Sequence, residues 1–124
     1  MMNSEQFDKI LHRRLESIEN TIGVKAKEYV RNDDRLHNFN VGARLTNKTR
    51  EEVLWEGYAL KHLASVFDII DDIREGNIPV DEHVNEKIGD LINYLILLEA
   101  CIKETISKNN LHVEGLYNRI KTQL

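Results

Sequence analysis

The chain contains 124 residues, of which 41% are hydrophobic and 31% charged, a balance typical of a globular domain and not of a disordered chain. Its 17 basic and 21 acidic side chains leave a net charge of −4, which argues against nucleic-acid binding, because nucleic-acid binders carry a clustered basic excess. The single cysteine, Cys101, lies in an apolar run, so we expect it to be buried, in a reducing, cytoplasmic compartment. No apolar run is long enough to span a bilayer, and we expect no membrane partner.

The first third of the chain predicts an amphipathic helix followed by a structured loop. Ser4 is a suitable N-cap, and apolar side chains then recur at three- and four-residue spacing from Phe7 to Ile22. Residues 31–39 are rich in Asn and Asp, whose short side chains bond to nearby backbone in turns and caps. We expect a short helix at residues 40–45.

Two long helices are predicted in the remainder. Thr49 and Glu52 form a capping box ahead of an apolar run that ends near Gly76. Asp81 is a suitable N-cap for the second long helix, which is apolar on most sides in its middle. A helix of that kind lies at the centre of its domain or against a second subunit.

Residues 107–110, Ser-Lys-Asn-Asn, are expected to end this second helix, and residues 111–124 to form a short terminal helix. The elements together predict one all-α domain spanning residues 1–124. We expect a compact helical bundle with two long antiparallel helices, assembled as a homodimer or a higher homo-oligomer.

Acidic side chains inside the two long helices are candidates for a metal site. Asp68 and Asp72 share one face of the first helix, and Glu86 and Asp90 share one face of the second. Because a short connection should pack the helices against each other, we expect these four carboxylates to converge. Oxygen ligands of this kind suit Mg²⁺. The alternative is that the acids are solvated or are neutralised by neighbouring basic side chains.

The loop around residues 33–39 is a second candidate. Arg35 and His37 are suited to contact phosphates, and Asn38 or Phe39 to meet a base or sugar. The alternative is a capping loop whose Phe39 fills the core. Further candidates lie on the long helices: Lys61 and Lys87 for phosphates, Asn93 and Tyr94 for a base or sugar pocket.

Four short motifs lie between Lys25 and Leu98: Lys25-x-x-Glu28-Tyr29, Asp34-Arg35-x-His37-Asn38-Phe39, Lys61-His62, and Glu86-Lys87-x-x-Asp90-x-x-Asn93-Tyr94-Leu95. In these motifs the chain resembles a group of small phage and prophage helical proteins. That group is distantly similar to the MazG-like all-α nucleoside triphosphate pyrophosphatases and to the nucleotide-modification-associated domain of phages. A phage origin would place the protein in the host cytoplasm.

The resemblance implies an oligomeric helical enzyme that uses Mg²⁺ to cleave a nucleoside triphosphate to the monophosphate and pyrophosphate. It implies that Glu52 and Glu56 match the first acidic motif, and that Glu86 and Asp90 match the second and take part in catalysis. It also places Lys25 among the nucleotide-binding residues. The second motif of MazG-like proteins reads Glu-x-x-Asp, whereas here one more residue separates the acids, which turns a ligand by about 100° around the helix.

Three hypotheses follow. The first is a Mg²⁺-dependent nucleoside triphosphate pyrophosphohydrolase that acts on a ribo- or deoxyribonucleotide. The second is a non-catalytic protein on the same scaffold that binds and sequesters a nucleotide or a nucleotide-derived signal. The third is a helical module that binds a protein partner.

Overall fold

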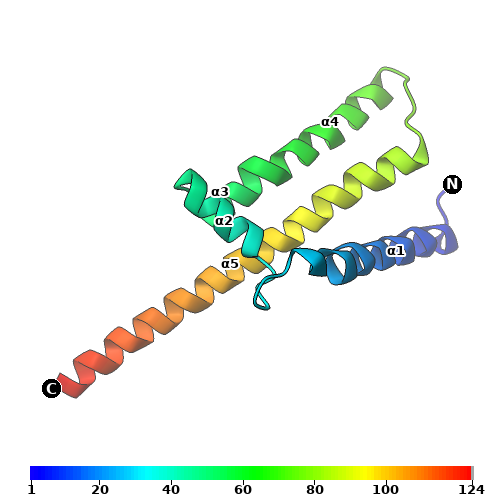
Figure 1. The fold of residues 1–124 in the computed structure, drawn as a ribbon. Helices are drawn as coiled ribbons and strands as arrows, with labels where there is room; N and C mark the ends of the chain where they lie inside the picture. Colours follow the sequence, from blue (N-terminus) through cyan, green and yellow to red (C-terminus); the bar gives the residue numbers. More distant parts are fainter. Residues whose placement is uncertain (124) are drawn as a thin grey trace.

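The structure is a computed structural model that describes residues 1–123 (Figure 1). Leu124, the last residue of the predicted domain and of the predicted terminal helix, lies outside the described residues. The described chain is built from helices joined by short loops and contains no β-strand, which confirms the all-α class. Within this range no helix combines the length and the apolar character that crossing a membrane requires.

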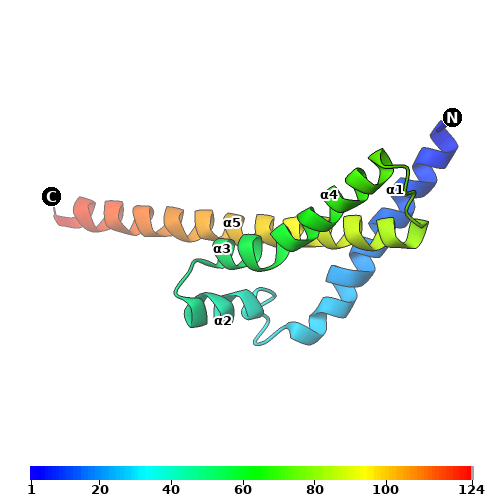
Figure 2. The same cartoon turned by 90° about the horizontal axis from the view of Figure 1, so that it is seen from above.

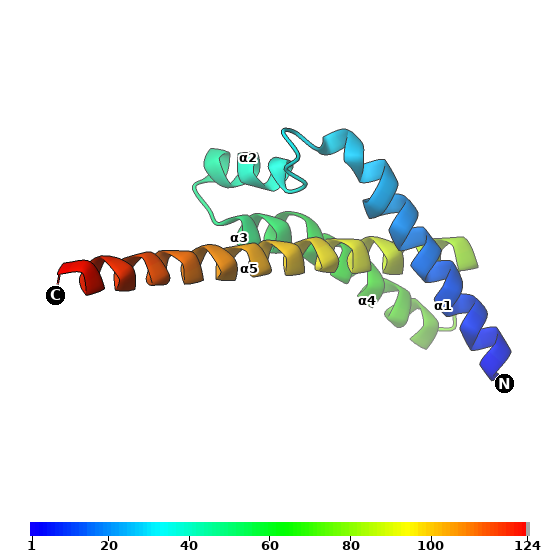
Figure 3. The same cartoon turned by 90° about the horizontal axis from the view of Figure 1, so that it is seen from below.

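The elements in chain order are α1 (Ser4–Ile18), the π-helical η1 (Glu19–Val24), the 3₁₀ helix η2 (Lys25–Tyr29), α2 (His37–Thr46), α3 (Arg50–Leu54), the π-helical η3 (Trp55–Ala59), α4 (Leu60–Arg74) and α5 (Asp81–Gln123). α5 is the longest element. α1 crosses it near its N-terminal end, and α3 lies beside its middle (Figures 2 and 3). The chain turns back between α4 and α5 at residues 75–80 (Figure 1).

Local side-chain chemistry sets the helix ends. The backbone N–H of Glu52 donates to the Thr49 hydroxyl over 3.1 Å, which confirms the predicted capping box at the start of α3. Gly76 has a φ of +87°, a left-handed conformation that suits glycine after a helix, as predicted. At α1 the predicted N-cap Ser4 is wrong by one residue. Asn3 is the cap, because its side chain and that of Gln6 bond reciprocally to each other's backbone N–H.

α5 does not end at residues 107–110, so the prediction of a separate terminal helix is wrong. The helix runs without a break through Asn109 and Asn110 to Gln123. The helical spacing of apolar side chains continues across the two asparagines, from Ile106 to Val113, and outweighs their modest helix propensity. Residues 106–123, which we call the C-terminal arm, project beyond the other helices (Figure 1).

The buried core is small and lies where α2 and α3 meet the middle of α5. Its members are Leu36, Phe39, Leu54 and Cys101, with Tyr94, Leu97 and Leu98 packed against them. Cys101 is buried as predicted, and burial raises the pKa of its thiol above the ordinary value.

Large apolar side chains remain exposed at both ends of the chain. They include Phe7, Ile10, Leu11 and Leu15 of α1 and Ile106, Val113, Leu116 and Ile120 of the C-terminal arm. The apolar stripe predicted for the first helix therefore does not enter a core within one chain. Contiguous faces of this kind mark interaction surfaces.

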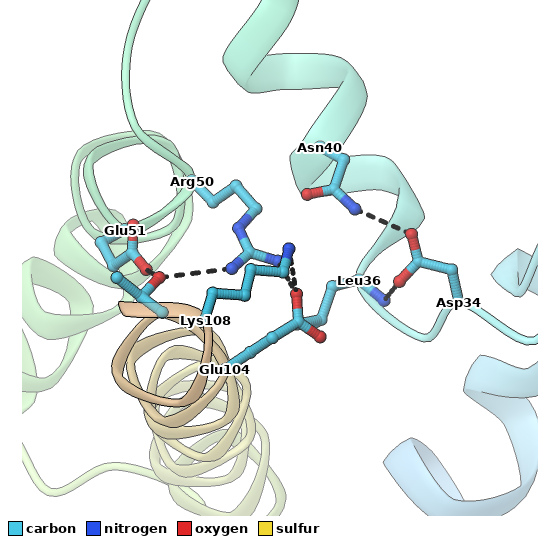
Figure 4. A network of polar contacts seen from close by, with 8 residues as sticks. Asp34, Leu36, Asn40, Arg50, Glu51, Glu104 and Lys108 are labelled. Atoms are coloured by element: carbon cyan, nitrogen blue, oxygen red, sulfur yellow. Dashed lines mark hydrogen bonds and ion pairs between the residues drawn. The ribbon is translucent and has the colours of Figure 1, made fainter. Parts of the chain in front are cut away.

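Polar contacts fasten α3 to α5 (Figure 4). Arg50 at the start of α3 donates to Glu104 over 2.6 Å, and Thr105 donates to Glu51 over 2.6 Å. Lys108 lies 3.1 Å from the same Glu104 carboxylate. The hydrogen bond from Arg50, followed by that from Lys108, lowers the pKa of Glu104 below its ordinary value.

One arginine makes a hydrogen bond that links α1 to α5. Arg14 donates to the backbone carbonyl of Asn85 over 3.1 Å. Its guanidinium lies over Gly89, where an added Cβ would meet the Arg14 Nη1. Gly89 therefore leaves room for the Arg14 guanidinium on α5, next to the pocket described below.

Candidate functional site

A pocket of about 460 Å³ opens between η1, η2, the loop before α2, the start of α2, η3 and the middle of α5. This volume falls within the usual range of small-molecule sites, roughly 300–1,000 Å³. Both π-helical segments contribute to its wall, η1 through Thr21 and Ile22 and η3 through Tyr58. π-Helical turns inside longer helices are found often at functional sites.

Many of the residues predicted to bind a nucleotide meet at this pocket. They are Lys25, Arg35, Asn38, Asn93 and Tyr94, and the predicted metal ligand Asp90 joins them. Lys25, Arg35 and Asn38 come from the region of residues 25–38, and the others come from two adjacent turns of α5. The fold thus brings together motifs that are more than fifty residues apart in sequence.

Three predicted nucleotide-binding residues lie outside the pocket wall. His37 begins α2 and is half-buried, Lys61 is exposed on α4, and Lys87 lies 3.6 Å from Glu86 on α5. Along α5 the pocket wall begins at Asp90, and Lys87 precedes it. From η3 and α4 the wall receives only Tyr58, and Lys61 follows it, so both lysines lie outside the pocket.

The aromatic rings of the site form a connected series. Phe39 meets Tyr58 edge to face at a centroid distance of 5.5 Å. Tyr58 stacks on Tyr94 at 5.3 Å, and His62 stacks on Tyr94 at 5.1 Å. Phe39 is buried in the core, as one of the two alternatives predicted, and it also lines the pocket; its contact with a base or sugar stays a prediction.

Tyr94 is the centre of this series. Burial, followed by the nearby Tyr58 and Asp90, raises the pKa of its phenol above the ordinary value of 10.0. The phenol is therefore neutral at physiological pH and keeps its O–H as a hydrogen-bond donor.

Two buried polar atoms beside the pocket lack a hydrogen-bond partner within the described residues: Nδ1 of His62 and Oδ1 of Asn93. The His62 Nδ1 lies 3.6 Å from Asp90 Oδ2, which is longer than a hydrogen bond. An unpaired buried polar group costs about 1–3 kcal/mol, so a bound water, ion or ligand that pairs with these atoms would offset that cost.

The cationic side of the pocket is supplied by Lys25 and Arg35. Arg35 donates to the backbone carbonyl of Ile22 and so ties the loop before α2 to η1. Asp34 shapes the same loop, since it accepts from the backbone N–H of Leu36 over 2.9 Å and from the Asn40 side chain over 2.7 Å (Figure 4). Lys25 is exposed and forms no ion pair with any described residue.

The predicted carboxylate cluster is not gathered in one chain. Asp68, Asp72 and Glu86 are exposed, whereas Asp90 is half-buried and faces His62. Across residues 1–123, no three acidic, histidine or cysteine side chains lie close enough together to hold a metal ion. α4, which carries Asp68 and Asp72, leaves α5 at an angle (Figures 2 and 3).

The acidic residues that the resemblance assigns to the first motif also lie elsewhere. Glu52 accepts a hydrogen bond from the Thr49 hydroxyl in the capping box of α3, and Glu56 pairs with Lys48 over 2.7 Å. Neither of them lines the pocket.

Tyr58 is the main pocket residue that the sequence analysis did not select. Its signal was present, because Tyr58 and His62 are four residues apart and therefore share a helix face. Thr21 and Ile22 gave no comparable signal, since the local π-helical turn that places them cannot be read from side-chain spacing.

Comparisons with known proteins add no family to this description: no protein-family model, no curated protein and no solved structure matches the chain.

Proposed function

We propose that the chain binds a nucleotide, or a small molecule derived from one, in the pocket between η2 and α5, and that binding is its function. The observation that carries this proposal is the meeting of cations, amides and stacked aromatic rings at one pocket of about 460 Å³. Each class of side chain suits one part of a nucleotide.

Lys25 and Arg35 would hold the phosphates. Both line the pocket, and Lys25 is free of any ion pair with the described residues. A guanidinium and an ammonium are the usual partners of phosphate oxygens in proteins. The acids Glu28 and Asp90 line the same pocket and would repel negative charge on any part of the ligand that lies near them.

The aromatic and amide side chains would hold the base or sugar. Tyr58 and Tyr94 offer ring surface for stacking, which contributes about 1–3 kcal/mol per base in single-stranded nucleic-acid sites. Asn38 and Asn93 offer amide groups that can both donate and accept hydrogen bonds. An Asn93 whose Oδ1 lacks a partner is suited to a ligand that brings a donor.

Hydrolysis is the alternative that the resemblance to MazG-like enzymes implies, with Glu86 and Asp90 as the acting residues and Mg²⁺ as cofactor. Of the four candidate ligands in the described chain, Asp90 alone lines the pocket. Binding therefore has geometric support that metal-dependent hydrolysis lacks, and we assign no step to a metal ion.

Titration with a panel of ribo- and deoxyribonucleotides tests the proposal, with thermal unfolding and calorimetry as readouts. A ligand at a hundred times its Kd stabilises the fold by about 2.7 kcal/mol, so at least one nucleotide should raise Tm. If no nucleotide raises Tm or releases heat, with or without Mg²⁺, the proposal fails. Pyrophosphate release that is lost in Asp90→Asn would instead establish the hydrolytic alternative.

Two broader expectations belong to the same proposal. The antiparallel packing of α4 and α5 is supported by their short connection at residues 75–80 and by the contacts of His62 with Asp90 and Tyr94. A cytoplasmic setting is supported by the buried free thiol of Cys101.

A further inference from the structure

The C-terminal arm of α5 carries an apolar stripe that no other part of the described chain covers. Every residue from 105 to 123 is exposed except Gly115, which is half-exposed. The arm also contains Asn109, Asn110 and Gly115, which are poor helix formers. Helices owe most of their stability in proteins to the packing of an apolar face, so this segment needs a partner to remain helical in water.

The stripe follows the seven-residue repeat of a coiled coil. Its members, which we call the seam, are Ile102, Ile106, Asn109, Val113, Leu116 and Ile120. The intervals alternate between four and three residues, with β-branched Ile106, Val113 and Ile120 at one core position. This placement is compatible with a parallel two-stranded coiled coil, and the repeat itself indicates that the partner is another helix of the same period.

We propose that the seam pairs with the seam of a second copy of this chain in a parallel, in-register two-stranded coiled coil. Asn109 selects this partner. Against an apolar helix its amide would be buried without a hydrogen bond, whereas an identical helix in register places the Asn109 amide of each copy opposite the other. An antiparallel pairing about the arm's midpoint would instead set Asn109 against Val113.

The charges that flank the seam are compatible with self-pairing. The positions beside it hold Lys103, Thr105, Asn110, His112, Tyr117 and Arg119. Thr105 is already hydrogen-bonded to Glu51 and Arg50 of α3, so the free pair in the parallel register is His112, which would face Tyr117 of the other copy. Among the described side chains of α5, no like charges meet across the interface, and none that flanks the seam is acidic and would require a basic partner helix.

This inference does not depend on the proposed function, because the seam shares no residue with the pocket. Sedimentation equilibrium on the full chain tests it, and we expect twice the 14.5 kDa of one chain. Val113→Asp would bury an unpaired charge in the seam and should weaken self-association by at least about tenfold. Leu111→Asp is the matched control, since Leu111 is exposed on the same arm but outside the seam, and it should leave the dimer intact.

Two readouts keep the result interpretable. Protection of the buried Cys101 from a thiol reagent reports that the body of the variant is folded. Val113→Cys should form a disulfide between copies on mild oxidation, because identical seam positions meet in the parallel register. A monomeric wild type, a dimer that survives Val113→Asp, a dimer that Leu111→Asp disrupts equally, or a dimer without the Val113→Cys cross-link would each overturn the proposal.

Discussion

The imidazole of His62 in α4 lies almost parallel to the ring of Tyr94 in α5, with centroids 5.1 Å apart and planes inclined by 11°. Tyr94 also stacks on Tyr58 of η3 at 5.3 Å. The Tyr94 ring on α5 therefore contacts both η3 and α4 and forms part of the pocket wall. Stability and ligand binding should consequently respond together when this ring is changed.

Replacing Tyr94 by leucine removes both stacking contacts but keeps an apolar side chain. Each aromatic contact contributes about 0.5–1.5 kcal/mol beyond the buried area, so Tyr94→Leu should lower the free energy of unfolding by about 1–3 kcal/mol. The measurement is urea unfolding, with nucleotide affinity determined on the folded variant. Tyr94→Phe keeps the ring and should cost much less stability. Equal losses in the two variants would show that the hydroxyl and not the ring matters.

Lys25 and Lys27 lie two residues apart in η2, but only Lys25 lines the pocket. Lys25→Ala should weaken nucleotide binding by about three- to tenfold at low salt, because a partly solvated cation–phosphate contact contributes of the order of 1 kcal/mol. Calorimetry at two salt concentrations measures the effect, which should shrink as salt screens the contact. Lys27→Ala removes the same net charge and should bind like the wild type. A comparable loss in both variants would indicate only a general charge effect.

The sequence predicted those parts of the fold that local chemistry determines. The Thr49 and Glu52 capping box and the turn at Gly76 are set by neighbouring atoms, and both were confirmed. The misplaced first N-cap was also readable, because Asn3 and Gln6 have the spacing of a capping box. The continuity of α5 was not readable, since Asn109 and Asn110 favour a stop and only the longer apolar repeat opposes it.

The candidate site was predictable where residues sit on one regular helix. Asp90, Asn93 and Tyr94 come to the pocket together because α5 is continuous there. The convergence of Asp68 with Glu86 depended instead on the angle between two helices. The angle between two packed helices follows from how their side chains interlock, which side-chain periodicity alone does not encode.

The link between Arg50 and Glu104 should make stability depend on acid pH. The hydrogen bond from Arg50 lowers the pKa of Glu104 in the folded chain below its ordinary value of 4.5. The contribution of this carboxylate is therefore present above pH 4.5 and is lost as pH falls through the lower, folded-state value. In Glu104→Gln, the free energy of unfolding, measured between neutral and acid pH, should fall less steeply with falling pH than in the wild type.

The effect should be small and salt-dependent, because the Glu104 side chain is 42% exposed. Glu114→Gln on the same helix is the matched control, since Glu114 forms no ion pair with the described residues. Its pH profile should follow that of the wild type. An unchanged profile in Glu104→Gln would mean that the pair does not contribute to folding.

The small core should make stability unusually sensitive to one leucine. Leu54 is fully buried between α2 and α5, and the cluster around it holds few other large side chains. Leu54→Ala should lower the free energy of unfolding by about 2–5 kcal/mol, the range for a buried leucine that leaves a cavity. Leu45→Ala makes the same chemical change at a side chain that is 81% exposed, and it should cost less than about 0.5 kcal/mol. Chemical unfolding of the two variants side by side measures the difference. A loss below about 1 kcal/mol for Leu54→Ala would place the stabilising core elsewhere, for instance at the exposed faces that a second copy would cover.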